Sequence, residues 1–295
     1  MKRIVTIVAL LLSFSASAQK AFEVKSERLE DKSVRLWAEK SYVGKVTVAL
    51  TFKKLENTSL YGDGIYTVES ASLNLERLRP IDADSHIGYS YSYRWFYGDV
   101  EAEADTTFVY RLPVSTQKLT QARNVVDMFT HYLKNENRNV PVASFDVEPT
   151  DTIYAARKGV VVKIDKNASQ QDQQLESSTE RAYVQVEHAD GSWALYRMLN
   201  PNSILVEVGQ TVYPDTPIGF PWSFDGERYL FFFSVLDHVW TDRGVKSDYK
   251  RFVPLFKTDL GVTHLRHGVE YRAVVDEELI EHEMSSREKK RRRRQ

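Results

Sequence analysis

The chain of 295 residues contains no cysteine, and its 40 lysines and arginines nearly balance its 41 aspartates and glutamates. The absence of cysteine excludes disulfide bonds and thiol catalysis, so stability must come from buried side chains, and the length suffices for roughly two domains. A nearly neutral chain has no overall attraction to nucleic acid, and no nucleic-acid partner is expected.

Residues 1–18 have the pattern of a secretory signal peptide. Lys2 and Arg3 precede an apolar run over residues 4–12, and Ser15-Ala-Ser-Ala18 resembles a cleavage site. The apolar run is too short to span a bilayer. We therefore expect an exported protein, periplasmic or extracellular, cleaved after Ala18; a retained anchor is the alternative.

Residues 19–114 are predicted to form an all-β domain of sandwich type. One stretch, His86–Gly98, places aromatic residues at every second position, and side chains alternate between the two faces of a strand. Two interpretations are open: a platform on which sugar rings or a partner stack, or one packed wall of the sandwich. The aromatic residues concerned are Tyr89, Tyr91, Tyr93, Trp95 and Tyr97.

Residues 115–138 are predicted to hold one short helix and a linker. Apolar residues from Val125 to Leu133 recur near helical spacing, so the helix is placed over Thr120–Leu133. The polar stretch Lys134–Asn139 then separates this helix from the next domain.

Residues 139–276 are predicted to form a second β domain. Its hydrophobic runs are rich in β-branched and aromatic residues and are bounded by Gly, Pro, Asp and Asn, which is typical of strands. We expect an antiparallel sheet folded over itself, with Asp237–Gly244 as a loop. The expected strands lie within 152–164, 183–188, 193–199, 204–212, 216–219, 229–235, 251–258 and 268–275.

Several short motifs follow one another in this second domain. They are Ile153–Val161 with Ala-Ala-Arg-Lys-Gly-Val-Val, His188-Ala-Asp-Gly191, Tyr196–Leu199, Val208–Val212 followed by Ile218-Gly219, and Tyr229–Val235. Their order resembles the β core of the lysostaphin-type (LytM-like) zinc endopeptidases, which cut peptidoglycan cross-bridges. The resemblance implies a LytM-like antiparallel core for this second domain. Together with the N-terminal sandwich-like domain and the short helix predicted above, it gives a mainly β fold.

The resemblance also indicates where a zinc site would lie. The family holds its metal with a His, an Asp and the second His of His-x-His, and two further histidines assist. In this sequence His131 takes the place of the first His. Ser144 takes the place of the Asp, or Asp146 does if the match is shifted. Met198 takes the place of one assisting His. The His-x-His motif falls on Tyr229/Phe231 or on Leu230/Phe232.

These substitutions remove most of the ligands. Zinc in a catalytic site needs three protein ligands, and neither a thioether nor a phenyl ring serves as one. We therefore predict no catalytic residue, no metal ligand and no cofactor, and a degenerate site formed by His131, Ser144, Asp146, Met198, Tyr229 and Phe231. The alternative is an active zinc endopeptidase with a rearranged site that uses His131 and Asp146.

Other histidines offer weaker signals. His188 matches a histidine that is common in the family's hairpin outside the metal site, so a structural role is expected. His238 is expected to be solvated on its loop, and Glu281-His-Glu283 lacks the spacing of a zinc helix.

Residues 277–295 are predicted to be a basic, disordered tail that begins as a fraying helix end. The block Arg287–Gln295 is strongly cationic. It is either a solvated tail or a contact for an anionic lipid, lipopolysaccharide or wall polymer.

Together these features favour an exported, catalytically degenerate LytM-like protein that acts as a binding or regulatory module in the bacterial envelope. Its expected partner is peptidoglycan or an envelope protein such as a wall hydrolase. The active zinc endopeptidase remains the alternative.

Overall fold

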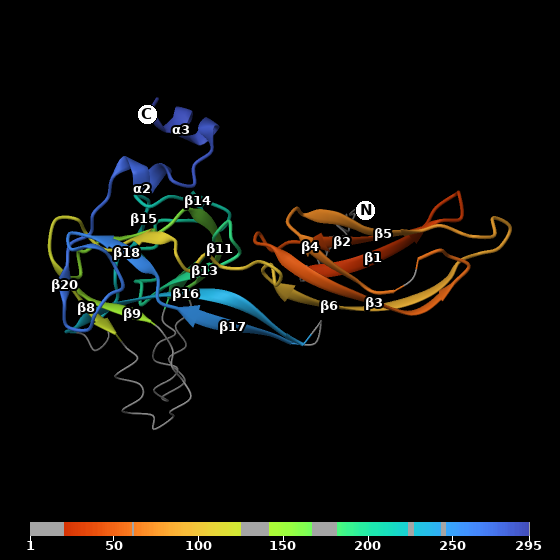
Figure 1. Ribbon diagram of the computed structural model, residues 1–295, viewed down its shortest axis with the longest axis horizontal. Helices are drawn as coiled ribbons and strands as arrows, with labels where there is room; N and C mark the ends of the chain where they lie inside the picture. The colour runs from red at the N-terminus through yellow and green to blue at the C-terminus, as the bar shows by residue number, and fades with distance from the viewer. Residues whose placement is uncertain are drawn as a thin grey trace, which may run out of the picture.

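The computed structural model describes residues 21–60, 62–124, 142–166, 182–223, 227–242 and 246–294. These residues form two β lobes that lie end to end, followed by two short helices (Figure 1). The prediction of a mainly β fold is confirmed. Within the described part of the chain, no helix is both long and apolar enough to cross a membrane.

The N-terminal module is a sandwich of two three-stranded antiparallel sheets. The first sheet has the order β1 (Phe22–Arg28), β2 (Val34–Lys40), β5 (Ser72–Leu78), and the second has the order β4 (Gly64–Val68), β3 (Val46–Glu56), β6 (Gly88–Tyr97). Side chains from both sheets meet in one hydrophobic core.

The aromatic residues of β6 form a packed wall of this sandwich. Tyr89, Tyr91, Tyr93 and Trp95 are partly buried against the core, and the ring centroids of Phe22 and Trp95 are 5.5 Å apart. The structure supports the packed-wall interpretation for these four residues. Tyr97 differs, because it is 39% exposed at the end of the strand that faces the second lobe.

The C-terminal lobe is built around a nine-stranded sheet. A two-stranded sheet of β10 (Ile153–Tyr154) and β15 (Pro217–Gly219) and a three-stranded sheet of β19 (Gly261–Thr263), β18 (Leu255–Thr258) and β7 (Val109–Arg111) add buried residues to the same core. The large sheet is therefore covered on one face. Its path is β14 (Thr211–Val212), β11 (Gly159–Asp165), β12 (Tyr183–Glu187), β13 (Trp193–Arg197), β16 (Tyr229–Asp242), β9 (Ala143–Val147), β8 (Thr120–Asn124) and β20 (Glu270–Tyr271), with β17 (Lys246–Phe252) paired to β16.

Three boundaries differ from the predictions. Thr120–Asn124 is strand β8 and not the start of a helix, because its backbone pairs with β9 and β20; the rest of the predicted helix lies outside the described residues. The stretch after Asp237 continues β16 to Asp242, where it pairs with β17, instead of forming a loop. The predicted boundary at residue 114 lies inside the second lobe, since β7 pairs with β18.

The basic tail is also ordered, contrary to the prediction. Two helices, α2 (Glu277–Glu281) and α3 (Ser286–Arg292), follow the last strand. Asp276 caps α2, and Ser285 with Glu288 forms a capping box for α3. Leu279, Ile280 and Met284 are buried, which attaches the pair to the lobe.

Candidate functional site

The register of β16 decides which side chains can form a site. Phe232 lies opposite Ser144 of β9 and Arg197 of β13, and Leu230 lies opposite Asp146. Residues directly opposite one another in an antiparallel pair share a face. These residues therefore lie together on the face of the sheet that we call the outer face.

The neighbouring positions of β16 point the other way. Phe231 and Phe233 are 0% and 1% exposed and belong to the main hydrophobic core. The Phe231 ring stacks against Phe145 and Tyr196, with centroids 5.9 and 6.4 Å away. Of the two sequence matches for His-x-His, Leu230/Phe232 is thus the one on the outer face.

The predicted site residues are consequently divided between two faces. Ser144, Asp146 and Met198 lie with Phe232 on or beside the outer face. Tyr229 and Phe231 instead pack against the core on the opposite face, apart from the other predicted site residues. His131 lies outside the described residues, so its place in the prediction stays untested.

The outer-face residues that were predicted to belong to the site are already engaged in other contacts. The Ser144 hydroxyl donates to the Arg123 carbonyl over 3.0 Å, and the Asp146 carboxylate is 2.8 Å from the Arg123 guanidinium. Met198 is fully buried against Phe232 and adopts a φ of 65°. In the described ranges, no three His, Cys, Asp or Glu side chains come together in a way that could hold a metal ion.

Farther along the outer face, toward the N-terminal module, lies a groove of about 370 Å³ that we call the aromatic groove. Its rim includes Tyr97 and Tyr249, which are 39% and 41% exposed. The charged residues among its described lining residues are all cationic. The lining consists of Tyr42, Tyr97, Val162, Lys163, Tyr183, Gln185, Trp193, Leu195, Arg197, Leu236 and Tyr249.

This groove has the chemistry of a site for sugar rings and anions. Exposed aromatic faces stack on apolar ring surfaces, and phenol hydroxyls supply polar contacts at the edge. Lys163 lies 5.2 Å from the centre of the Tyr183 ring, and its hydrogen bond with Tyr183 raises the pKa of the lysine, which stays charged. Arg197 offers a fork of N–H donors suited to carboxylates.

Contacts between the two lobes fix the position of the groove's end wall. The rings of Tyr42 and Tyr97 meet edge to face at 4.6 Å, and His238 hydrogen-bonds the Tyr97 carbonyl. Gly98 adopts a φ of +88°, and a Cβ there would lie 2.8 Å from His238 and Trp193. Glycine is therefore required at this junction. The expectation that His238 is solvated was wrong, since it is 7% exposed.

A second contact between the lobes is made by Glu187, which does not line the groove. The Glu187 carboxylate accepts the Lys45 backbone N–H at 3.0 Å, which ties β12 to the start of β3. Burial raises the pKa of Glu187, and the hydrogen bond and the positive charge of Lys45 oppose that rise. A carboxylate in this place fixes the two lobes relative to each other.

His188 has the structural role that was predicted for it. It is 2% exposed, and its Nδ1–H donates to the Lys158 carbonyl at 2.7 Å. Burial, assisted by the charge of Arg157, lowers the pKa of His188 to about 3. The ring is neutral in the folded protein at every pH above that value.

This histidine is expected to make stability depend on pH. In the unfolded chain it takes up a proton near its ordinary pKa of 6.5, but in the folded chain only near 3. Its stabilising contribution is complete above 6.5 and is lost as the pH falls, with a slope of at most about 1.4 kcal/mol per pH unit. Urea unfolding at several pH values gives the free energy of unfolding for the wild type and for His188→Asn. Below pH 6.5 this free energy should fall less steeply with decreasing pH in the variant. Equal pH dependence in the two proteins would contradict this assignment.

The sequence interpretation missed the aromatic groove, although a signal was present. In β12 and β13, residues such as Tyr183, Gln185, Leu195 and Arg197 alternate with Val184, Val186, Ala194 and Tyr196 of the core. Period-two alternation of this kind marks a half-exposed sheet. The contribution of Tyr42 and Tyr97 from the other lobe could not be read from that pattern.

No family model and no curated protein matches the chain. Among solved structures, the chain is similar to one described as the SpoIIQ–SpoIIIAH pore forming complex, with 19% identity, a TM-score of 0.29, and coverage of 49% of this chain and 89% of that chain.

Two other similar structures cover more of the chain. Csd3 from Helicobacter pylori has 10% identity and a TM-score of 0.32, and the match covers 79% of this chain and 72% of that chain. A zinc containing peptidase from Vibrio cholerae has 14% identity and a TM-score of 0.26, with coverage of 69% and 74%. Because every TM-score is below 0.5, these similarities define neither the family nor the function of the chain.

Proposed function

We propose that the protein is an exported LytM-like module that binds peptidoglycan, or another envelope component, through the outer face of its large sheet. One observation carries this proposal. The outer face holds Phe232, Met198 and Ser144 at positions where the resemblance expects zinc-site residues, yet the same face continues into the aromatic groove.

The chemistry of the groove favours cell-wall material over a folded protein. Peptidoglycan combines sugar rings with carboxylate-bearing peptides, and the groove combines aromatic rings with Lys163 and Arg197. Sugar rings stack on tyrosine and tryptophan faces, and carboxylates pair with the cations. An extended strand of wall polymer also fits an open groove along a sheet better than a globular partner does. A wall hydrolase that binds here is the second possible partner.

Co-sedimentation of the purified protein with peptidoglycan sacculi tests the proposal. Tyr249→Ala removes an exposed aromatic ring and Lys163→Glu reverses a groove charge, and each is expected to weaken binding roughly five- to tenfold. Lys53→Glu is the matched control, because it makes the same charge change on an exposed residue of β3 that is not part of the groove. Equal loss in the control would show non-specific charge attraction.

Metal analysis separates this proposal from the enzymatic alternative. Stoichiometric zinc in the purified protein, lost in His131→Ala together with peptidoglycan cleavage, would establish the endopeptidase. Asp146 is the described residue required by that alternative, and its carboxylate is paired with Arg123. Binding to sacculi without release of soluble fragments would support the binding module.

A further inference from the structure

The C-terminal helices are held against the lobe by a buried ionic cluster. Arg157 is 3% exposed and donates to both oxygens of Glu283, at 2.7 and 3.0 Å, and to Asp190 at 2.7 Å. Lys158 donates to the Glu283 carbonyl at 2.9 Å. The segment between α2 and α3 is therefore fixed to the start of β11.

Ion pairs then fix one side of α3. Glu288 is 2.9 Å from Lys158 and accepts the Tyr213 hydroxyl at 2.8 Å, and these contacts help to lower its pKa to about 2 although its burial opposes this. Arg292 is 2.6 Å from Asp215. This side of the helix faces the lobe.

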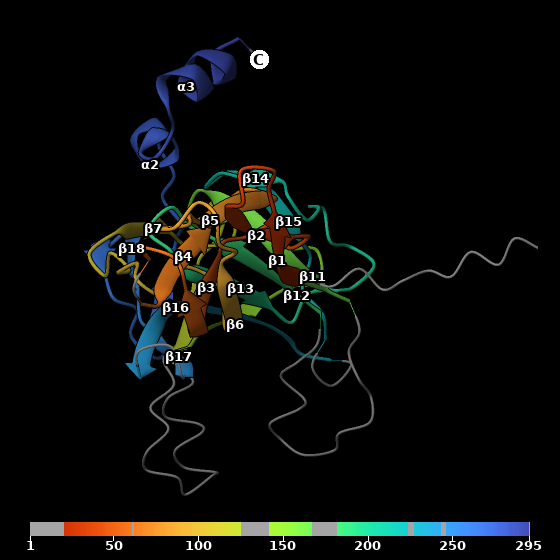
Figure 2. The ribbon, with the colours of Figure 1, turned by 90° about the vertical axis from the view of Figure 1, so that its right-hand side faces the viewer.

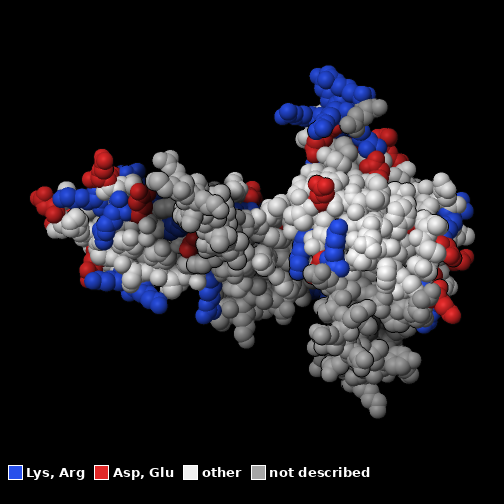
Figure 3. All heavy atoms as spheres, turned by 180° about the vertical axis from the view of Figure 1, so that it is seen from behind, with Lys and Arg blue, Asp and Glu red and all other residues white. Residues whose placement is uncertain are grey.

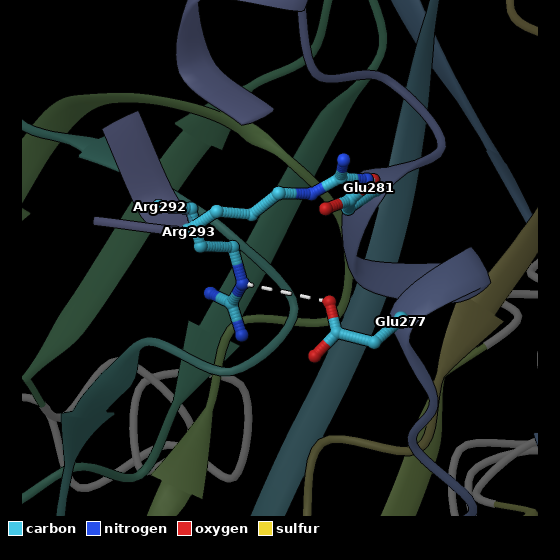
Figure 4. Close-up of a pocket in the computed structure, with 4 residues that line it drawn as sticks. All are labelled: Glu277, Glu281, Arg292 and Arg293. Atoms are coloured by element: carbon cyan, nitrogen blue, oxygen red, sulfur yellow. Dashed lines mark hydrogen bonds and ion pairs between the residues drawn. The ribbon is translucent and has the colours of Figure 1, made fainter. Parts of the chain in front are cut away.

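A second set of pairs joins α3 to α2. Arg292 points toward Glu277, and Arg293 lies beside Glu281 (Figure 4). Lys289 also lies near Glu281, with Nζ 3.7 Å from the carboxylate. These basic residues are thus neutralised within the protein.

The remaining basic residues form a separate stripe. Arg287, Lys290 and Arg291 of α3 have the spacing i, i+3 and i+4, which places them on one side of the helix, and Arg294 follows in the turn just after its end. All four are exposed, and none has a carboxylate partner among the described residues. We call this set the cationic stripe.

The stripe is placed where a flat surface can reach it. In two perpendicular views α3 stands beyond the rest of the C-terminal lobe (Figures 1 and 2). The space-filling view shows the basic side chains gathered on this projecting end (Figure 3). Residues 285–294 include no apolar side chain, so the helix has no face that would enter a hydrocarbon layer.

We propose that the cationic stripe binds the phosphate headgroups of an anionic phospholipid bilayer and holds the protein at the membrane surface. Charge complementarity carries the choice of partner, because the four cations of the stripe are exposed, while the carboxylates of Glu281 and Glu288 are paired with cations of the protein itself. A projecting end can contact the planar array of phosphates at a bilayer surface more readily than the curved phosphate backbone of a nucleic-acid duplex. The interaction is electrostatic and peripheral, and each cation contributes about fivefold to the affinity at low salt.

Vesicle co-sedimentation of the full chain tests this proposal. The protein is expected to bind vesicles that contain phosphatidylglycerol, to bind pure phosphatidylcholine weakly, and to dissociate as salt is added. The variant Arg287→Ser, Lys290→Ser, Arg291→Ser and Arg294→Ser should lose roughly 600-fold in affinity, the product of four fivefold contributions. Its helices should persist by circular dichroism, because Glu288 and Arg292 are unchanged.

A matched control makes the result specific to the stripe. Lys53→Ser, Lys54→Ser, Arg77→Ser and Arg79→Ser remove the same charge from exposed residues of the N-terminal module, and binding should be kept. Equal loss in both variants, or unchanged binding in the stripe variant, would overturn the proposal. Binding to an oligonucleotide, lipopolysaccharide or wall polymer without binding to phosphatidylglycerol vesicles would overturn it as well. Failure here leaves the aromatic groove and its sacculus assay unaffected.

Discussion

Replacing Arg157 by methionine is expected to lower the free energy of unfolding by about 3 kcal/mol. Removing one partner of a buried ionic cluster leaves uncompensated charge, which costs about 3–5 kcal/mol. We expect the lower end of that range, because the side chains of Asp190 and Glu283 are 14% and 16% exposed. The guanidinium also lies 3.7 Å from the centre of the Phe108 ring, and this packing is lost with it.

The pKa of Arg157 agrees with this assignment. Burial alone would lower the pKa, but the hydrogen bond to Glu283 and the charges of Glu283 and Asp190 raise it above its ordinary value. The folded state therefore favours the charged arginine. The same variant is expected to release α2 and α3, which would show as faster amide hydrogen exchange over residues 277–292.

Denaturant unfolding of the full chain measures the effect. Arg77→Met is the matched control, because Arg77 also pairs with an aspartate, Asp31, but both side chains are about half exposed. That exposed pair should contribute less than about 1 kcal/mol. Comparable losses in the two variants, or unchanged exchange in α2 and α3 of Arg157→Met, would show that the cluster does not hold the helices.

This cluster also shows why the tail was wrongly predicted to be disordered. Part of the signal was local: Ser285 and Glu288 have the spacing of a capping box. The contacts that fix the segment are not local, since Arg157 and Glu283 are 126 positions apart in the sequence. From sequence alone, a charged segment without an apolar stripe is predicted to be solvated, because the residues that form ion pairs with it cannot be identified.

The start of the predicted helix was wrong for a related reason. The apolar residues that suggested a helix begin at Val125, outside the described residues, whereas Thr120–Asn124 pairs with two strands. Pairing with strands distant in sequence overrides a weak local preference. Where the hydrophobic runs were bounded by turn residues, as in Tyr183–Glu187 and Trp193–Arg197, the strands were predicted correctly.

The site was predicted less completely than the strands. The run Tyr229-Leu-Phe-Phe-Phe233 is hydrophobic at every position, so its sequence does not reveal which residues face the core. A shift of one residue moves every side chain to the other face of a sheet. The pairing of Phe232 with Ser144 and Arg197 resolves the ambiguity, and Ser144 lies on a strand far from β16 in the chain.

Phe231→Ala is expected to lower the free energy of unfolding by about 3–5 kcal/mol. The side chain is 0% exposed and belongs to the main core, so truncation leaves a cavity that the surrounding strands fill only in part. Loss of the stacked contacts with Phe145 and Tyr196 adds to the cost. Urea unfolding followed by tryptophan fluorescence gives the difference from the wild type.

Phe232→Ala is the matched control, because it removes the same atoms from the adjacent position. Phe232 is 8% exposed and packs in a small cluster with Met198, Val142 and Leu230, so its truncation should cost about 2 kcal/mol less. If the loss at Phe232 exceeded the loss at Phe231, the register of β16 would be reversed. Tyr229 and Phe231 would then lie on the face that carries Ser144, and the placement of Leu230 and Phe232 on the outer face would be wrong.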